Sequence, residues 1–156
     1  MNNTPPSPTA SFLSDVLIVE DDTVQCEEMA AYLGRSGLDV HTAFNGAAAL
    51  REAHNHKPRV ALLDYNLPDG TGVELAAHLR ELLPDTAILM MSGRIDGLSE
   101  ETLQQLGITI FVNKPVPLGP LRQAIMKLVA RTKSGDAVRP PRASGWMTAG
   151  FGGTRH

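Results

Sequence analysis

The sequence predicts an α/β fold: a doubly wound (βα)5 arrangement, with a five-stranded parallel sheet and helices on both of its faces. Five short apolar runs predict the strands, at residues 16–19, 38–43, 60–63, 87–91 and 108–112. The first, third and fourth runs are continuously apolar, which is typical of strands that are buried on both faces of a parallel sheet. Helical patterns fill the gaps between the runs, and right-handed crossovers would place those helices on both faces.

Residues that suit helix N-termini precede the first four helical patterns. The candidate N-caps are Asp22, Asn45, Thr71 and Ser99. Gln25 and Glu74 stand three residues after the first and third of these caps, which is the spacing of a capping box. Gly34 or Gly37 can end the first helix. Apolar residues at helical spacing between positions 118 and 128 predict the fifth helix.

Length and composition indicate one globular domain with flexible ends. The chain has 156 residues, of which 42% are hydrophobic and 20% are charged, and this is enough for one domain with its own core. Residues 1–14 are rich in Pro, Ser, Thr and Asn, which predicts a flexible N-terminal extension. Residues 132–156 turn to Gly, Pro, Ser and Arg and include Trp146, which predicts a disordered C-terminal tail. The domain itself is expected at residues 15–131.

Charge and cysteine content argue against several kinds of partner. A net charge of −3 gives no general attraction to nucleic acid or to an anionic membrane. The sequence shows neither a secretory signal nor an apolar run long enough to span a bilayer. Cys26 is the only cysteine; it suits a reducing compartment and is expected to be a small core residue. We therefore expect a cytoplasmic protein that contacts neither membrane nor nucleic acid directly.

Polar residues stand at the ends of four of the five predicted strands. Glu20 and Asp21 follow the first strand, Asp64 the third, Ser92 the fourth and Lys114 the fifth. Since the carboxyl ends of parallel strands share one edge of a sheet, these side chains should meet. Clustered carboxylates suit a hard cation such as Mg²⁺, which commonly pairs one or two of them with a phosphate oxygen. A carboxylate can also be the nucleophile that becomes an aspartyl phosphate, so the set suits phosphoryl transfer.

The five histidines do not suggest a second metal site. His54 and His56 lie near a predicted helix end and are expected to face solvent, while His41 and His78 fall in other elements. The spacing of a zinc motif is not present, so the sequence predicts no histidine metal site.

Four motifs in order resemble the bacterial response-regulator receiver domain, over roughly residues 13–131. They are VEDD at 19–22, LDYNLPDGTG at 63–72, MSG at 91–93 and FVNKP at 111–115. Each motif stands at the end of a predicted strand, and four such matches in order are highly specific. The resemblance implies a flavodoxin-like fold with strand order 2-1-3-4-5.

The resemblance also implies a role for each acidic residue. Asp64 is the expected phosphoacceptor and, with Asp21, a direct ligand of Mg²⁺ (or Mn²⁺). Glu20 is the expected ligand through water, and the backbone carbonyl of Asn66 is a further ligand. Asp22 is better explained as the helix cap, so metal binding is expected to depend on it less.

The remaining motif residues are expected to respond to the phosphoryl group. Ser92 takes the position of the switch hydroxyl, where Thr is commoner, and Lys114 takes that of the family lysine. Phe111 takes the aromatic switch position; a permanent core role explains this residue about equally well. The resemblance further implies a cis peptide bond between Lys114 and Pro115.

The implied function is signalling rather than metabolic catalysis. A sensor histidine kinase or a histidine phosphotransfer protein would supply the phosphoryl group, and the chain would catalyse only its own phosphorylation and dephosphorylation. The expected output surface is the fourth helix, fifth strand and fifth helix, roughly residues 98–130, which would bind a downstream protein or a second copy of the chain. The alternative is an aspartyl-phosphate-forming phosphatase on small substrates. Phosphatases of the haloacid-dehalogenase type carry an acid/base Asp where this chain has Asn66, which favours the receiver.

Overall fold

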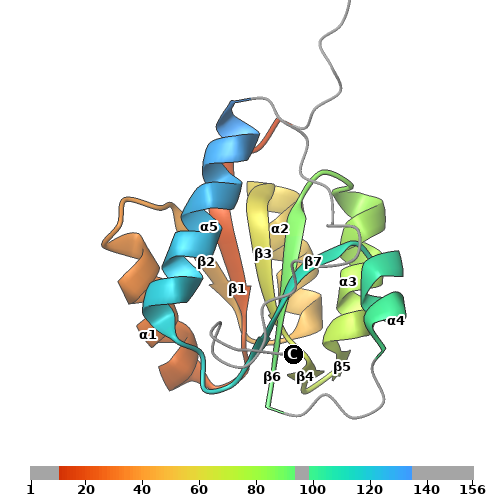
Figure 1. Ribbon diagram of the computed structural model, residues 1–156. Helices are drawn as coiled ribbons and strands as arrows, with labels where there is room; N and C mark the ends of the chain where they lie inside the picture. The colour runs from red at the N-terminus through yellow and green to blue at the C-terminus, as the bar shows by residue number, and fades with distance from the viewer. Residues whose placement is uncertain (1–10, 94–98, 135–156) are drawn as a thin grey trace, which may run out of the picture.

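Figure 1 shows the computed structural model of the chain, which describes residues 11–93 and 99–134. A five-stranded parallel sheet lies at its centre, in the order β2-β1-β3-β6-β7. Its strands are β1 (Ser14–Val19), β2 (Val40–Ala43), β3 (Pro58–Asp64), β6 (Ala87–Ser92) and β7 (Ile108–Asn113). Counting only these five strands, the order is 2-1-3-4-5, and the predicted fold class is confirmed.

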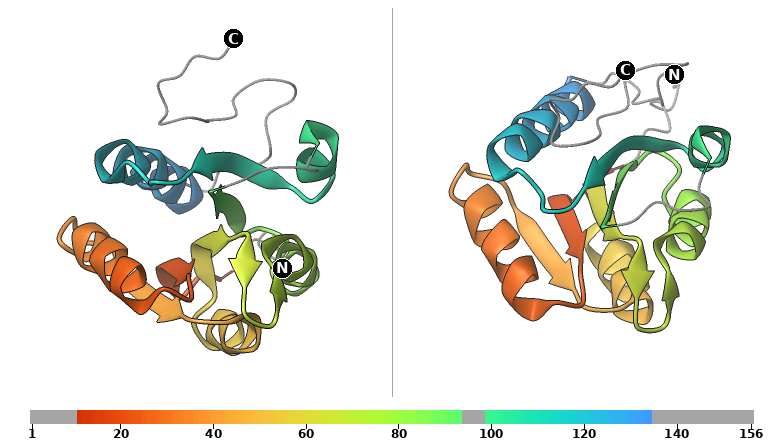
Figure 2. Two further views of the ribbon diagram at one scale, coloured as in Figure 1. Left: turned by 90° about the horizontal axis from the view of Figure 1, so that it is seen from below. Right: turned by 60° about the horizontal axis from the view of Figure 1, so that its bottom comes forward.

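Helices cover both faces of the sheet, as Figure 2 shows. They are α1 (Thr23–Gly34), α2 (Gly46–His56), α3 (Gly72–Leu82), α4 (Glu100–Gln105) and α5 (Leu118–Lys133). Residues of α1 and α5 share one core cluster with alternate strand residues. Residues of α2, α3 and α4 share the other cluster with the remaining strand residues. The strands are thus buried on both faces, which explains their continuously apolar sequences.

The predicted helix caps are all present. The side chains of Asp22, Asn45, Thr71 and Ser99 each accept a hydrogen bond from the backbone N–H three residues later. The reciprocal bond of a full capping box forms only at Thr71, with Glu74. At Asp22 the backbone N–H donates instead to Glu20 Oε2, at 3.0 Å. The first cap is therefore joined to an acidic residue at the sheet edge.

One strand carries an irregularity that decides which way its side chains point. Ile88 pairs with Ile108 and Leu89 pairs with Ile110, so Thr109 is an extra residue in β7, a β-bulge. Strict alternation would place Ile108 and Ile110 on the same face. Because of the bulge, Ile108 and Phe111 both pack on the face covered by α2, α3 and α4, while Ile110 packs on the opposite face.

A small hairpin that the sequence analysis did not predict follows β3. It consists of β4 (Asn66–Leu67) and β5 (Gly70–Thr71), which pair antiparallel. Asp69 at its turn accepts hydrogen bonds from the backbone N–H groups of Gly46 (2.7 Å) and Ala47 (3.0 Å), at the start of α2. These two bonds hold the pKa of Asp69 below its ordinary value. The hairpin thereby connects the loop after β3 to α2.

Arg80 of α3 ties two turns together at the far end of the sheet from this hairpin. Its guanidinium donates to the backbone carbonyls of Pro84 (2.7 Å) and Thr86 (2.9 Å), in the turn before β6. It also donates to those of Leu106 (3.4 Å) and Gly107 (2.9 Å), in the turn between α4 and β7. A single side chain therefore fixes the C-terminal end of α4 to the end of α3.

The ends of the chain fall mainly outside the described residues, including Trp146 of the predicted tail. Within the predicted N-terminal extension, Leu13 N donates to Lys57 O at 3.0 Å, and the Phe12 ring lies 5.2 Å from the Arg59 guanidinium carbon. At the other end α5 continues to Lys133. Among the described residues, no helix is both long enough and apolar enough to span a bilayer.

Replacing Gly72 with Ala should lower the free energy of unfolding by about 1–3 kcal/mol, because the site has no room for a methyl group. A Cβ at Gly72 would clash with the backbone oxygen of Asp64 and would lie 2.8 Å from Met90 Sδ and 3.0 Å from Tyr65 Cα. Urea unfolding measures the change. Gly34→Ala, where a Cβ meets nothing within 4 Å, is the matched control and should be neutral or stabilising by up to about 1 kcal/mol. Equal effects at the two glycines would contradict this account.

Candidate functional site

The structure brings the polar strand ends together at one edge of the sheet. Glu20 follows β1, Asp64 ends β3, Ser92 ends β6 and Lys114 follows β7. The Lys114 ammonium donates to Glu20 Oε1 at 2.7 Å and to Asp64 Oδ2 at 3.1 Å. One lysine therefore joins three strands that are far apart in the sequence.

The two carboxylates that contact Lys114 are buried and have a second hydrogen bond each. Glu20 Oε2 accepts from the backbone N–H of Asp22 at 3.0 Å, and Asp64 Oδ1 accepts from that of Asn66 at 3.3 Å. Each carboxylate thus has one oxygen on the ammonium and the other on the backbone of the following loop. This arrangement compensates charge that would be costly to bury alone.

Asp21 completes a set of carboxylates that could hold a metal ion. One oxygen each from Glu20, Asp21 and Asp64 lie within 4.8 Å of one another. Asp21 is exposed, and Asn66 lines the same hollow with Asp64 and Lys114. An all-oxygen set that is open to water on one side fits the chemistry of Mg²⁺, which keeps several of its waters. Asp22 is also exposed, but its carboxylate is used as the cap of α1.

The lysine is held charged by its partners. Burial alone would lower the pKa of Lys114, but its hydrogen bonds and charge interactions with Glu20 and Asp64 outweigh burial, and the pKa is raised. Its contribution to stability is therefore complete at neutral pH and is lost only as the pH rises through this raised value. The backbone N–H of Lys114 donates to Ser92 O at 2.9 Å, and the predicted cis peptide bond to Pro115 is present.

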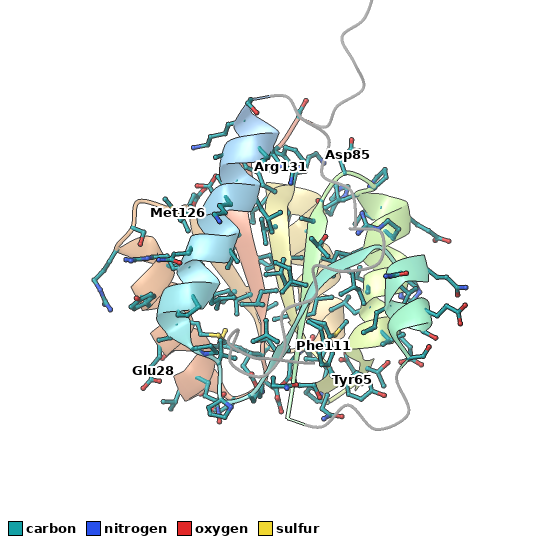
Figure 3. The ribbon with its side chains drawn as sticks, in the orientation of Figure 1. Glu28, Tyr65, Asp85, Phe111, Met126 and Arg131 are labelled. Atoms are coloured by element: carbon teal, nitrogen blue, oxygen red, sulfur yellow. The ribbon has the colours of Figure 1, made fainter. Side chains whose placement is uncertain are left out.

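Ser92 and Phe111, the two expected switch residues, are both buried. Ser92 is fully buried at the end of β6, and Phe111 is 3% exposed. Figure 3 shows Phe111 inside the domain, above Tyr65 near the edge where the strands end. The ring packs in the cluster that also contains Leu103 and Leu106 from the α4 segment. The aromatic ring is thus already inside the domain in this structure, in the same core cluster as Leu103 of α4.

Cys26 lies near the site but is not a nucleophile. It is fully buried in the core cluster beneath α1 and α5, as the sequence analysis expected. Burial, with the nearby negative charges of Glu20 and Glu27, raises the pKa of its thiol to about 12. The thiol therefore stays protonated and unreactive at neutral pH.

His54 is exposed, and His41 and His78 lie in separate elements, as expected, but the sequence analysis did not foresee that His41 and His56 would meet. His41 on β2 and His56 at the end of α2 stack with ring centroids 3.8 Å apart, and Glu52 contacts both rings. Glu52 and His56 stand four residues apart on one helix, which is a signal present in the sequence. The approach of His41 from another element is tertiary and could not be read from spacing.

Comparisons with known proteins agree on one family. The family model for the response regulator receiver domain matches residues 16–126, more than half of the chain. Among curated proteins, the transcriptional regulatory protein KdpE of Mycobacterium tuberculosis is 29% identical over 126 residues, which are 81% of this chain and 55% of that protein. A cyclic di-GMP phosphodiesterase of Thermotoga maritima is 34% identical over 110 residues, 70% of this chain and 29% of that protein.

Solved structures give the same result for the fold. The response regulator receiver domain protein (CheY-like) from Methanospirillum hungatei is 26% identical, with a TM-score of 0.73 over 79% of this chain and 98% of that chain. The regulator KdpE, by contrast, is about twice as long as the matched region, since the chain covers 55% of it. The resemblance is to one domain of that protein.

Replacing Lys114 with Met should lower the free energy of unfolding at pH 7 by about 3 kcal/mol, because two buried carboxylates lose their shared positive charge. Urea unfolding at pH 7 measures the effect. Lys127→Met, on the exposed side of α5, is the control and should change stability by less than about 0.5 kcal/mol. Equal losses in the two variants would show that the shared charge of Lys114 does not stabilise the fold.

Proposed function

This chain belongs to the response regulator receiver family of two-component systems, and from that membership we propose that Asp64 accepts a phosphoryl group. The proposed donor is a phosphohistidine on a sensor histidine kinase or on a histidine phosphotransfer protein. An Asp64 carboxylate oxygen attacks phosphorus, the bond from phosphorus to the histidine nitrogen breaks, and an aspartyl phosphate forms. The domain then acts as a signalling switch, catalysing only its own phosphorylation and its reversal.

The observation that carries this proposal is the shared contact of Lys114 with Asp64 and Glu20. It fixes the Asp64 carboxylate at the end of β3, beside an ammonium that can neutralise a phosphoryl oxygen. Phosphoryl transfer depends mainly on such positioning and charge neutralisation. The Ser92 hydroxyl, at the end of the neighbouring strand β6, is the proposed donor to a second phosphoryl oxygen.

The acidic set supports a divalent cation as cofactor. Asp21 and Asp64 are the proposed direct ligands, Glu20 the ligand through water, and the Asn66 carbonyl a further ligand. When bound, Mg²⁺ or Mn²⁺ would neutralise charge on the transferring phosphoryl group. The alternative, a phosphatase of the haloacid-dehalogenase type, is less well supported. Such a phosphatase carries an acid/base Asp at the position of Asn66, and an amide cannot act as an acid or base in its place.

The proposed output surface consists of α4, β7 and α5. Phe111 lies on β7 in the core cluster that includes Leu103 of α4 and is flanked by Leu106 just after that helix, so movement of Ser92 toward a phosphoryl oxygen can change packing in that cluster. Because the ring is already inside, we propose that active-like packing is populated before phosphorylation and is stabilised by it. A downstream protein or a second copy of the chain would bind the changed surface.

Proposed location and partners follow from the same premise. Cytoplasmic histidine kinase domains would be the phosphoryl source, and the free buried thiol of Cys26 suits a reducing compartment. The output is proposed to be a protein contact rather than direct binding of nucleic acid, in line with the net charge of −3.

A small phosphodonor with Mg²⁺ should add one phosphoryl group to the wild-type chain and none to Asp64→Asn, as measured by intact mass. Asp85→Asn is the matched control, since Asp85 lies at the opposite end of the domain (Figure 3), and it should label normally.

Amide NMR of the phosphorylated wild type should show shifts in residues 99–130 as well as around Asp64. Equal labelling of Asp64→Asn would refute the phosphoacceptor, and shifts confined to the loops at Asp64 would refute the output surface.

Calorimetric titration with Mg²⁺ should show that Asp21→Asn weakens binding by at least about tenfold, or about 1.4 kcal/mol. Asp22→Asn should change the affinity by less than about threefold, because its carboxylate caps α1 and Asn is an equally good cap. The two variants differ by one position and carry the same change of charge, so long-range electrostatics are matched. A greater loss in Asp22→Asn would mean that the metal ligands are assigned one residue out of register.

A further inference from the structure

A second group of metal-ligating side chains lies on the outer edge of the domain, away from the acidic hollow. It contains His41 on the edge strand β2, with Glu52 and His56 on α2. Glu52 Oε1 lies 3.4 Å from His56 Nε2 and 4.0 Å from His41 Nδ1. The two imidazole rings stack, with centroids 3.8 Å apart and an interplanar angle of 12°. Three potential ligands from two elements thus converge on one point.

We propose that His41, Glu52 and His56 form a binding site for Zn²⁺. Two imidazole nitrogens and one carboxylate oxygen are a ligand set that Zn²⁺ favours, with water as the fourth ligand. Nitrogen ligands distinguish this site from the all-oxygen set at Asp64, which suits Mg²⁺. The site is independent of the proposed phosphorylation, and neither proposal needs the other.

The distances are within reach of coordination. One ligand atom from each side chain lies within 4.8 Å of the other two, while ligand atoms of tetrahedral zinc lie about 3.3 Å apart, given zinc–nitrogen bonds of about 2.0 Å. Closure therefore requires the most distant pair of ligand atoms to approach by up to about 1.5 Å and the parallel rings to turn toward each other. The three side chains are between a quarter and two fifths exposed, so they have room to make this movement.

A fourth residue orients one of the proposed ligands. Asp39 Oδ1 lies 3.4 Å from His41 Nε2, on the opposite side of the ring from Glu52. A carboxylate on one nitrogen of a metal-binding histidine commonly fixes the ring and leaves the other nitrogen for the metal. Here that leaves Nδ1, the nitrogen nearer Glu52, as the ligand atom. Asp39 is therefore a positioning residue for the site.

The place of the site in the fold also favours a cation. His56 is the last residue of α2, and the C-terminal end of a helix carries partial negative charge. The nearby Lys57 ammonium is directed to the carbonyl of His54, at 3.2 Å. The N-terminal end of α2 lies about 15 Å away, since the helix has 11 residues. There the backbone N–H groups of Gly46 and Ala47 donate to the Asp69 carboxylate. A bound ion would cross-link β2 to α2 without touching the acidic hollow.

Titration of the full chain with ZnCl₂, in a large excess of Mg²⁺ to hold the acidic hollow, tests the proposal by calorimetry. Wild type should bind one Zn²⁺, and its unfolding temperature should rise with Zn²⁺ concentration. His41→Asn, His56→Asn and Glu52→Gln should each weaken binding by at least about tenfold. His54→Asn is the matched control, because His54 is an exposed histidine two residues from His56 on the same helix, and its affinity should equal that of wild type.

Spectroscopy separates coordination from nonspecific binding. Co²⁺ in place of Zn²⁺ should give the visible absorption of a four-coordinate site in wild type, and histidine-selective NMR should show two imidazoles, not more, shifting on addition of Zn²⁺. The proposal fails if wild type and the three ligand variants bind Zn²⁺ equally. It also fails if Asp21→Asn, which leaves the histidines intact, is the variant that abolishes binding. Circular dichroism of each variant confirms that it is folded before titration.

Discussion

Two buried carboxylates sharing one ammonium are the constraint on which the arrangement of the sheet depends. Glu20 and Asp64 are almost fully removed from water, and their burial is tolerable only with the Lys114 ammonium between them. The residues of these pairs stand 94 and 50 positions apart in the sequence. For one side chain to contact both, β1, β3 and β7 must end at the same edge. Parallel strands joined by helices meet that requirement.

The same compensation fixes the charged groups of the site. Each buried carboxylate has one oxygen on the ammonium and one on a backbone N–H, while Asp21 stays exposed at the mouth of the hollow. The positions of these charges are therefore set by the protein's own groups, without a ligand. The hairpin that follows Asp64 adds rigidity, because Asp69 satisfies two of the free N–H groups at the start of α2.

Much of this architecture could be predicted from sequence, because its signals are local. Continuous apolar runs identify strands buried on both faces, and short polar side chains identify the caps at Asp22, Asn45, Thr71 and Ser99. The grouping of the strand-end residues followed from parallel topology alone. What could not be predicted depends on tertiary contacts. The β4–β5 hairpin has strands of two residues each, too short for a periodic signal, and the stacking of His41 on His56 requires the packing of α2 against β2.

The bulge in β7 was similarly hidden, since one extra residue leaves the apolar character of the run unchanged. Its effect is nonetheless specific: Phe111 packs on the α4 side of the sheet because Thr109 is inserted before it. An assignment of facing residues by alternation from Ile108 would place that ring on the wrong face. The position of the aromatic residue relative to Ser92 therefore depends on a backbone irregularity as well as on residue type.

The contacts of Arg80 determine how α4 is able to move. Its guanidinium holds the carbonyls of Leu106 and Gly107 directly after α4, and those of Pro84 and Thr86 before β6. The helix is only six residues long, so these bonds fix its C-terminal end relative to α3, while Leu103 packs the helix onto the core. The switch proposed at Ser92 would have to act within this limit: the C-terminal end of α4 is the part least free to be displaced.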